Sequence, residues 1–287
     1  MDVTAVERIA NAVLYEGYLL YPYRPSAVKN QQRFNFGVLY PPRFCDGSDT
    51  PQMLTECLVE GPRSARLRVK TRFLQLAERE QRQEGMEREV DFTASITAMA
   101  CAPLRRWFGF GPVAGALELT AAKVGEDLFR MTLRVSNSSA FDGSQRDQAL
   151  LHSMVSLHSI LQVEGGQFIS LLEPSDRHRE AAAECRNVGA WPVMAGDPKQ
   201  RDTMLVSPII LYDYPQIAPE SPGDLFDGTE IDEILALRIL TMTDEEKEEV
   251  RAGDERARQI LERTEQLPAE HFQKLHGALR QSAKVPG

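Results

Sequence analysis

The most restrictive feature of the sequence is a strict two-residue alternation between residues 65 and 74. Small or apolar side chains alternate there with four basic ones, at Arg66, Arg68, Lys70 and Arg72. Because successive side chains of a strand point to opposite faces, the pattern predicts a strand with one face in a core. Residues 89–97 alternate likewise, with Glu89 and Asp91 outward. We expect the two strands to form a hairpin in which these acids neutralise the basic face, although such a face could instead grip phosphates.

Several further strands are predicted in the first 214 residues. They cover residues 33–40, 117–121, 129–135, 157–163, 168–172 and 204–212. Gly165-Gly166 predicts a two-residue hairpin turn between 157–163 and 168–172, since glycine readily adopts positive φ. Pro208 argues for an edge strand or a bulge. Ser175 is expected to cap a helix over 176–185.

The composition changes near Tyr214. Three prolines follow within eight residues, and the pattern then becomes helical, with capping-box spacing at Thr243 and Glu246. Residues 215–287 contain 16 acids and 9 bases, so they carry −7 of the net charge of −9. We therefore predict an α+β protein with two parts. An antiparallel β-rich core, a sandwich or a strongly curved sheet, occupies 1–214, and an acidic helical segment packed on it occupies 215–287.

Composition and spacing argue against several functional classes. The chain has no apolar run of the length that spans a membrane and no basic, then apolar, start typical of a secretory signal. Four cysteines without a C-x-x-C pair predict reduced thiols and a cytoplasmic location, with no metal or cofactor. The net charge of −9 disfavours nucleic-acid binding.

Candidate chemistry is sparse. Five carboxylates within residues 224–233 could bind a cation, but their register does not fit an EF-hand, and acids gather at helix N-termini for the dipole alone. His158 would act as a general base if it met Glu16 or Asp213 in space. No nucleophile elbow or phosphate-binding glycine loop occurs.

Two stretches of tyrosine, proline and charge carry the strongest indication of function. Residues 13–24 read VLYEGYLLYPYR, and residues 207–233 read SPIILYDYPQIAPESPGDLFDGTEIDE. Tyrosine and arginine are over-represented at recognition hot spots, although a half-buried strand would explain the tyrosines equally well. The signs are complementary, so we expect the stretches to adjoin, with Arg24 or Arg33 paired to a carboxylate of 213–227.

The first stretch, continued through Lys29-Asn30 to Phe36-Gly37, together with the second stretch and residues 165–174, resembles an uncharacterised bacterial protein family encoded beside NiFe-hydrogenase structural and maturation genes. The resemblance runs along most of the chain and implies an accessory or assembly role, with a hydrogenase subunit or maturation factor as partner.

The function predicted from the sequence is therefore a non-catalytic accessory or assembly factor that binds a larger enzyme. The alternative is a hydrolase-like enzyme with a carboxylate or His–carboxylate site. The predicted partner-binding residues are Tyr18, Tyr21, Tyr23, Arg24, Arg33, Asp213, Tyr214, Asp224 and Asp227.

Overall fold

The computed structural model describes residues 3–15, 23–24, 35–45, 49–79, 82–216 and 232–266. The chain divides into two compact units, and each is described by itself. The first comprises Met1–Tyr15 and Asn35–Pro215, and the second comprises Glu16–Phe34 and Gln216–Gly287. This division lies one residue from the predicted boundary, and it groups residues 16–34 with the second unit.

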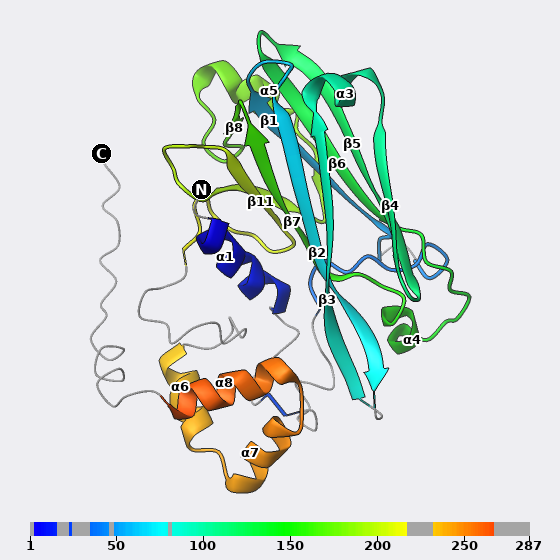
Figure 1. The fold of residues 1–287 in the computed structure, drawn as a ribbon, viewed down its shortest axis with the longest axis vertical. Coiled ribbons are helices and arrows are strands. Elements are labelled where there is room, and N and C mark those ends of the chain that lie inside the picture. The colour runs from blue at the N-terminus through cyan, green and yellow to red at the C-terminus, as the bar shows by residue number, and fades with distance from the viewer. Residues whose placement is uncertain are drawn as a thin grey trace. The chain divides into compact units, whose positions relative to one another are not determined.

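The first unit is built on two antiparallel sheets that pack together, which confirms the predicted α+β class (Figure 1). The six-stranded sheet has the order β4-β5-β6-β1-β8, with β9 also pairing with β1. Its strands are β1 (Gln52–Glu60), β4 (Leu104–Phe110), β5 (Val113–Gly125), β6 (Leu128–Asn137), β8 (Gln167–Ile169) and β9 (Asn187–Val188).

The five-stranded sheet has the order β10-β11-β7-β2-β3. Its strands are β2 (Arg66–Arg79), β3 (Arg82–Ser95), β7 (Val155–Glu164), β10 (Trp191–Ala195) and β11 (Thr203–Ser207). Short helices join the strands, namely α3 (Ile96–Cys101), α4 (Arg146–Leu150), the 3-10 turn η1 (Asp176–His178) and α5 (Arg179–Ala183).

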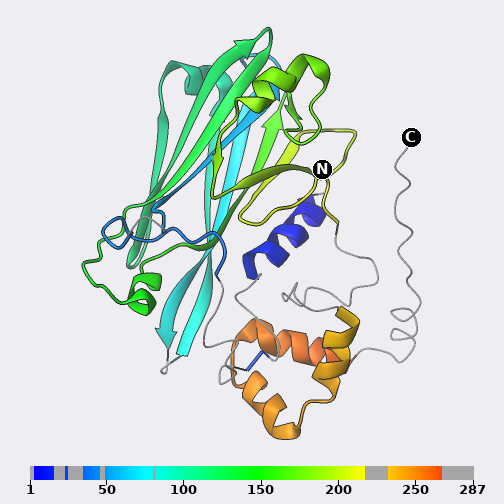
Figure 2. The same ribbon diagram turned by 180° about the vertical axis from the view of Figure 1, so that it is seen from behind.

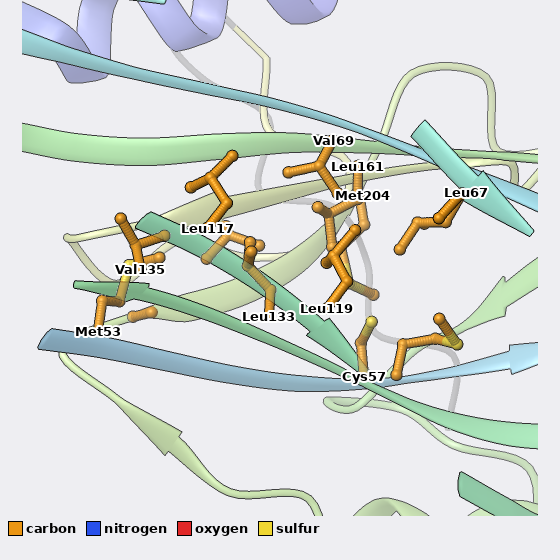
Figure 3. Packing of buried hydrophobic residues seen from close by; sticks show 14 of the residues in the cluster. Met53, Cys57, Leu67, Val69, Leu117, Leu119, Leu133, Val135, Leu161 and Met204 are labelled. Atoms are coloured by element: carbon orange, nitrogen blue, oxygen red, sulfur yellow. The ribbon is translucent and has the colours of Figure 1, made fainter. Parts of the chain in front are cut away.

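The main hydrophobic core lies between the inner faces of the two sheets (Figure 3). Alternate residues of β5 and β6, such as Leu117, Leu119 and Leu133, meet side chains of the other sheet, such as Val69 and Met204. Each of these side chains is at most 2% exposed. The two-residue period of the sequence therefore places one side of each strand in the core.

Helix α1 (Val3–Tyr15) packs on the outer face of the five-stranded sheet, against β7, β11 and β2 (Figure 2). Its Val6 and Ala10 form a second buried cluster with Ile160, Val193 and Leu205. Because α1 covers this face, polar side chains that β2 and β7 direct outward lie beneath the helix or at its margin.

Three of the four basic side chains on the outer face of β2 pair with acids of the same chain, as the sequence predicted, whereas Arg66 makes no ion pair with the described residues. The apolar residues Leu67 and Val69 alternate with the basic ones and are buried. The ion pairs are Arg68–Asp91 at 2.9 Å, Lys70–Glu89 at 3.4 Å, Lys70–Glu7 at 3.2 Å and Arg72–Glu87 at 3.2 Å. The acids come from β3 and, in Glu7, from α1, so the face holds these elements together.

The predicted hairpin across Gly165-Gly166 is wrong. Strand β7 pairs with β2 and β11, whereas β8 pairs with β1 of the other sheet. Only Gly165 has positive φ, so the pair does not form the predicted turn. A Cβ on Gly61 would lie 2.8 Å from the Cα of Gly166, and one on Gly166 would lie 3.0 Å from the carbonyl oxygen of Glu60. The glycines therefore serve a close approach of two backbones where the chain passes between sheets.

Three other local expectations need correction. Within the described part of 33–40, Leu39 forms only isolated bridges, with Thr50 and Met154. Strand β11 ends at Ser207 and lies between β10 and β7, so Pro208 ends a non-edge strand rather than interrupting an edge strand. The helix expected over 176–185 is split into η1 and α5, and the Ser175 side chain makes no cap hydrogen bond.

The second unit contains three helices in its described part, which are α6 (Asp232–Leu240), α7 (Asp244–Arg251) and α8 (Glu255–Glu265). The predicted capping box is confirmed, because the Glu246 amide donates to Thr243 Oγ1 at 3.2 Å and the Thr243 amide donates to Glu246 Oε2 at 3.0 Å. Among the helices described, none is long and apolar enough to cross a membrane.

Candidate functional site

The segment after β11 is fastened to the rest of the first unit by Asp213. The amide of Met194 donates to Asp213 Oδ1 at 2.7 Å, and Ser170 Oγ donates to Asp213 Oδ2 at 2.5 Å. The Tyr214 amide in turn donates to the Met194 carbonyl at 2.7 Å. One carboxylate thus joins the edge strand β10 to the loop after β8. Such charge-assisted hydrogen bonds are about twice as strong as neutral ones.

Tyr214 holds this segment in an uncommon backbone conformation. Its φ is 54°, in the left-handed region that a bulky residue rarely adopts. Its ring packs on the inter-sheet core, and burial raises the pKa of the phenol against the opposing influence of the Arg201 guanidinium. Arg201 also has a left-handed φ, 51°. Backbone strain of this kind costs roughly 1–3 kcal/mol per residue and gathers at functional sites.

Large apolar side chains lie exposed on and around this fastened segment. Ile210 is 71% exposed and Tyr212 84%, on either side of Leu211, which packs against the cluster under α1. Trp191, 41% exposed, pairs with Ser207 at the end of β11, and Leu172, 51% exposed, follows Ser170. We define the 208–214 surface as Leu172, Trp191, Ile210, Tyr212, Asp213 and Tyr214.

The sequence prediction found part of this surface and missed the rest. Asp213 and Tyr214 were predicted, and the hydrogen bond of Ser170 brings residues 165–174 beside them, although these lie some forty residues earlier. Trp191 carries no motif that would have indicated it, and Leu172 lies within residues 165–174, to which the resemblance assigns no role. The run Ile209–Leu211 was interpreted as strand, which hid the exposure of Ile210.

The predicted candidates of the second unit that the structure describes lie within its own packing. Tyr23 is 4% exposed and has a φ of 60°. Arg24 pairs with Glu246 at 3.1 Å and with Glu249 at 4.0 Å, both on α7. Most of 213–227 lies outside the described residues, so the predicted pairing of Arg24 or Arg33 with a carboxylate of that range stays a prediction. Five predicted residues lie outside the described residues: Tyr18, Tyr21, Arg33, Asp224 and Asp227. The expectation that the two stretches adjoin stays a prediction.

His158, the sequence candidate for a general base, is fully buried. Its Nδ1 lies 2.9 Å from the Ser156 carbonyl oxygen, and its Nε2 has no hydrogen-bond partner among the described residues. Burial lowers the pKa of His158 to about 4, with Arg72 lowering it further while the Ser156 hydrogen bond and Glu87 oppose the change. Asp213 is engaged by Met194 and Ser170. Without exposure His158 cannot touch a substrate, and its neutral ring belongs to the packing beneath α1.

The described ranges contain no group of three or more histidine, cysteine or acidic side chains placed to hold a metal ion. All four cysteines are free thiols, and burial raises the pKa of Cys57 and that of Cys185, the latter to about 11. These two thiols are therefore held in the protonated form, which is a poor metal ligand.

A comparison of the sequence with protein-family models found no matching family, and a comparison with curated proteins found no match. Functional proposals for this chain therefore depend on its own residues and their geometry.

Proposed function

We propose that the chain is an accessory or assembly factor that binds a larger protein through the 208–214 surface. The observation that carries this proposal is the exposure of Ile210 and Tyr212 on a segment that is firmly hydrogen-bonded. Large apolar and aromatic groups on a pre-ordered backbone suit protein recognition, because little conformational entropy is lost on binding. A hydrogenase subunit or maturation factor is the partner that the sequence resemblance implies.

The chemistry of the surface favours a protein partner over other ligands. Tyr212 and Trp191 combine apolar area with a polar end, which is the composition of binding hot spots. Asp213 has both carboxylate oxygens engaged within the chain, so it acts as a brace that positions the neighbouring aromatic groups. We expect most of the binding free energy to come from Ile210 and Tyr212.

A photo-crosslinking experiment tests the location. The photoreactive residue p-benzoylphenylalanine, placed at position 212 in the full chain, should crosslink one defined protein in the native host. The same residue at Glu126, an exposed turn between β5 and β6, serves as the control. A product that forms equally at both positions would argue against a specific surface.

Purified components then test the energetics. Tyr212→Ala and Ile210→Ser should each raise the dissociation constant about tenfold or more. This corresponds to a loss of about 1.4 kcal/mol or more of binding free energy. Trp107→Ala is the matched control, since Trp107 is 66% exposed but lies on β4 in the six-stranded sheet. If Trp107→Ala weakens binding as much as Tyr212→Ala does, the 208–214 surface is not the docking site.

A further inference from the structure

A serine, a histidine and a glutamate contact one another in turn where η1 lies beside the end of β1. Ser175 Oγ lies 3.0 Å from His178 Nδ1, and His178 Nε2 lies 3.4 Å from Glu60 Oε1. Ser175 is exposed, whereas His178 is 5% exposed. The hydroxyl is therefore open to solvent, the imidazole is buried, and the Glu60 side chain is 20% exposed.

The elements of the fold hold each group in place. Glu60 is the last residue of β1 and pairs with Gln167 of β8, whose Nε2 donates to Glu60 Oε2 at 2.7 Å. Arg177 Nη2 lies 2.7 Å from Glu60 Oε1. Burial raises the pKa of Glu60, but the Gln167, Arg177 and His178 contacts outweigh it and leave the pKa below its ordinary value. The glutamate therefore stays ionised.

The ionised carboxylate fixes the proton on the histidine. A carboxylate only accepts hydrogen bonds, so in the neutral ring Nε2 carries the hydrogen that faces Glu60. Nδ1 then presents its lone pair to Ser175, whose hydroxyl donates to it. A nucleophile bonded to a base that is itself oriented by a third group is the arrangement that activates serine in acyl transfer.

The sequence predicted a structural role for Ser175, as a helix cap. Ser175 stands at the helix-capping position before η1, but its side chain makes no cap hydrogen bond and turns to the His178 ring instead. The side chain is thus available for chemistry rather than occupied by the backbone.

We propose that Ser175, His178 and Glu60 form a serine-nucleophile site that hydrolyses small carboxylic esters with good leaving groups. Ser175 and His178 are the catalytic residues, and Glu60 is a positioning residue. This activity goes beyond partner binding and gives the hydrolase alternative a defined site. None of its residues belongs to the 208–214 surface, so either proposal can fail without the other.

The reaction proceeds in two balanced steps. Ser175 Oγ attacks the ester carbonyl carbon while its proton passes to His178 Nδ1, and the carbon–oxygen bond to the alcohol breaks as that proton is delivered to the leaving oxygen. Water then attacks the acyl-serine and loses a proton to Nδ1. The bond between the carbonyl carbon and Ser175 Oγ breaks, Oγ takes that proton back from Nδ1, and the carboxylic acid leaves. Glu60 stabilises the imidazolium that forms in each step.

Active-site labelling tests the nucleophile. The full chain is treated with a fluorophosphonate probe and the modified residue is located by peptide mass spectrometry. Ser175 should be labelled, and Ser175→Ala should abolish the labelling. Ser144→Ala, which removes an exposed serine from another loop, should label as the wild type does. Failure to label Ser175, or labelling of another residue that persists in Ser175→Ala, overturns the proposal.

Kinetics with p-nitrophenyl acetate test the other two roles. A burst of p-nitrophenol should accompany formation of acetylated Ser175, and His178→Gln should slow acylation about 10²-fold, since general-base catalysis contributes at least that much. Glu60→Gln should lower kcat at unchanged KM, and Glu60→Asp should restore part of the rate. Equal burst rates in wild type and His178→Gln would show that the Ser175–His178 contact only shapes the turn.

Discussion

The buried imidazole of His158 makes the stability of the first unit depend on pH. The ordinary histidine pKa of 6.5 falls to about 4 in the folded chain because the ring is fully buried. Between these two values the unfolded chain binds a proton and the folded chain does not. Stability is therefore complete above about pH 7, falls as the pH drops from about 6.5 to about 4, and levels off below that.

The magnitude follows from the same two values. Each pH unit of difference between folded and unfolded pKa is worth 1.36 kcal/mol, so the wild type should lose about 3 kcal/mol of unfolding free energy to His158 over this window. No discount for solvent screening applies, since the ring has no exposure. The slope at mid-window should approach one proton, about 1.4 kcal/mol per pH unit.

The assay compares the wild type with His158→Phe, which keeps a ring of similar shape but cannot titrate. Urea unfolding at a series of pH values between 4 and 8 is followed by tryptophan fluorescence. Both tryptophans, Trp107 and Trp191, lie in the first unit, so the signal reports that unit alone. Carboxylates titrate in both proteins and cancel in the difference between the two curves. Parallel curves from pH 7 to pH 4 would refute the argument that burial keeps His158 neutral.

Three further changes test the packing. Gly37→Ala should destabilise the fold by about 1–3 kcal/mol more than Gly189→Ala. Both positions have positive φ, but only a Cβ at position 37 would clash with the Pro208 side chain. The difference in stability is measured from the urea midpoints of the two variants. Thr71→Val leaves the buried Ser159 hydroxyl, now 2.8 Å from Thr71 Oγ1, unpaired at a cost of about 1–3 kcal/mol, and adding Ser159→Ala should recover part of the loss in a double-mutant cycle. Thr243→Ala should cost about 1 kcal/mol by removing the cap of α7, seen as reduced helical circular dichroism on heating.

Local pattern predicted the strands well where one face is buried. The alternation at 65–74 and 89–97 became β2 and β3, since apolar residues such as Val69 and Val90 enter the core while their basic and acidic neighbours pair outside. Here the pattern, the register and the charges all favour one arrangement, so periodicity was sufficient.

Strand partners were harder to predict than strands. Gly165-Gly166 is a strong local turn signal, yet the chain there leaves one sheet for the other, because β8 finds its partner in β1, a hundred residues earlier. That choice depends on packing between distant segments, which no local pattern contains. The same limit explains the candidate sites, since neither the Ser170–Asp213 bond nor the Glu60–His178 contact leaves a trace in sequence spacing.

The backbone hydrogen bonds of Met194 with Asp213 and Tyr214 also protect one edge of the five-stranded sheet from self-association. Strand β10 ends the five-stranded sheet, and a free sheet edge invites another copy to add a strand and begin a polymer. Pro192 has no amide hydrogen to offer there, and two residues on, both backbone groups of Met194 are occupied by Asp213 and Tyr214. The outward backbone groups of β10 at these positions are therefore not free to pair with a strand of another copy. The exposed aromatic side chains beside β10 do not adjoin a free sheet edge that could start a fibre.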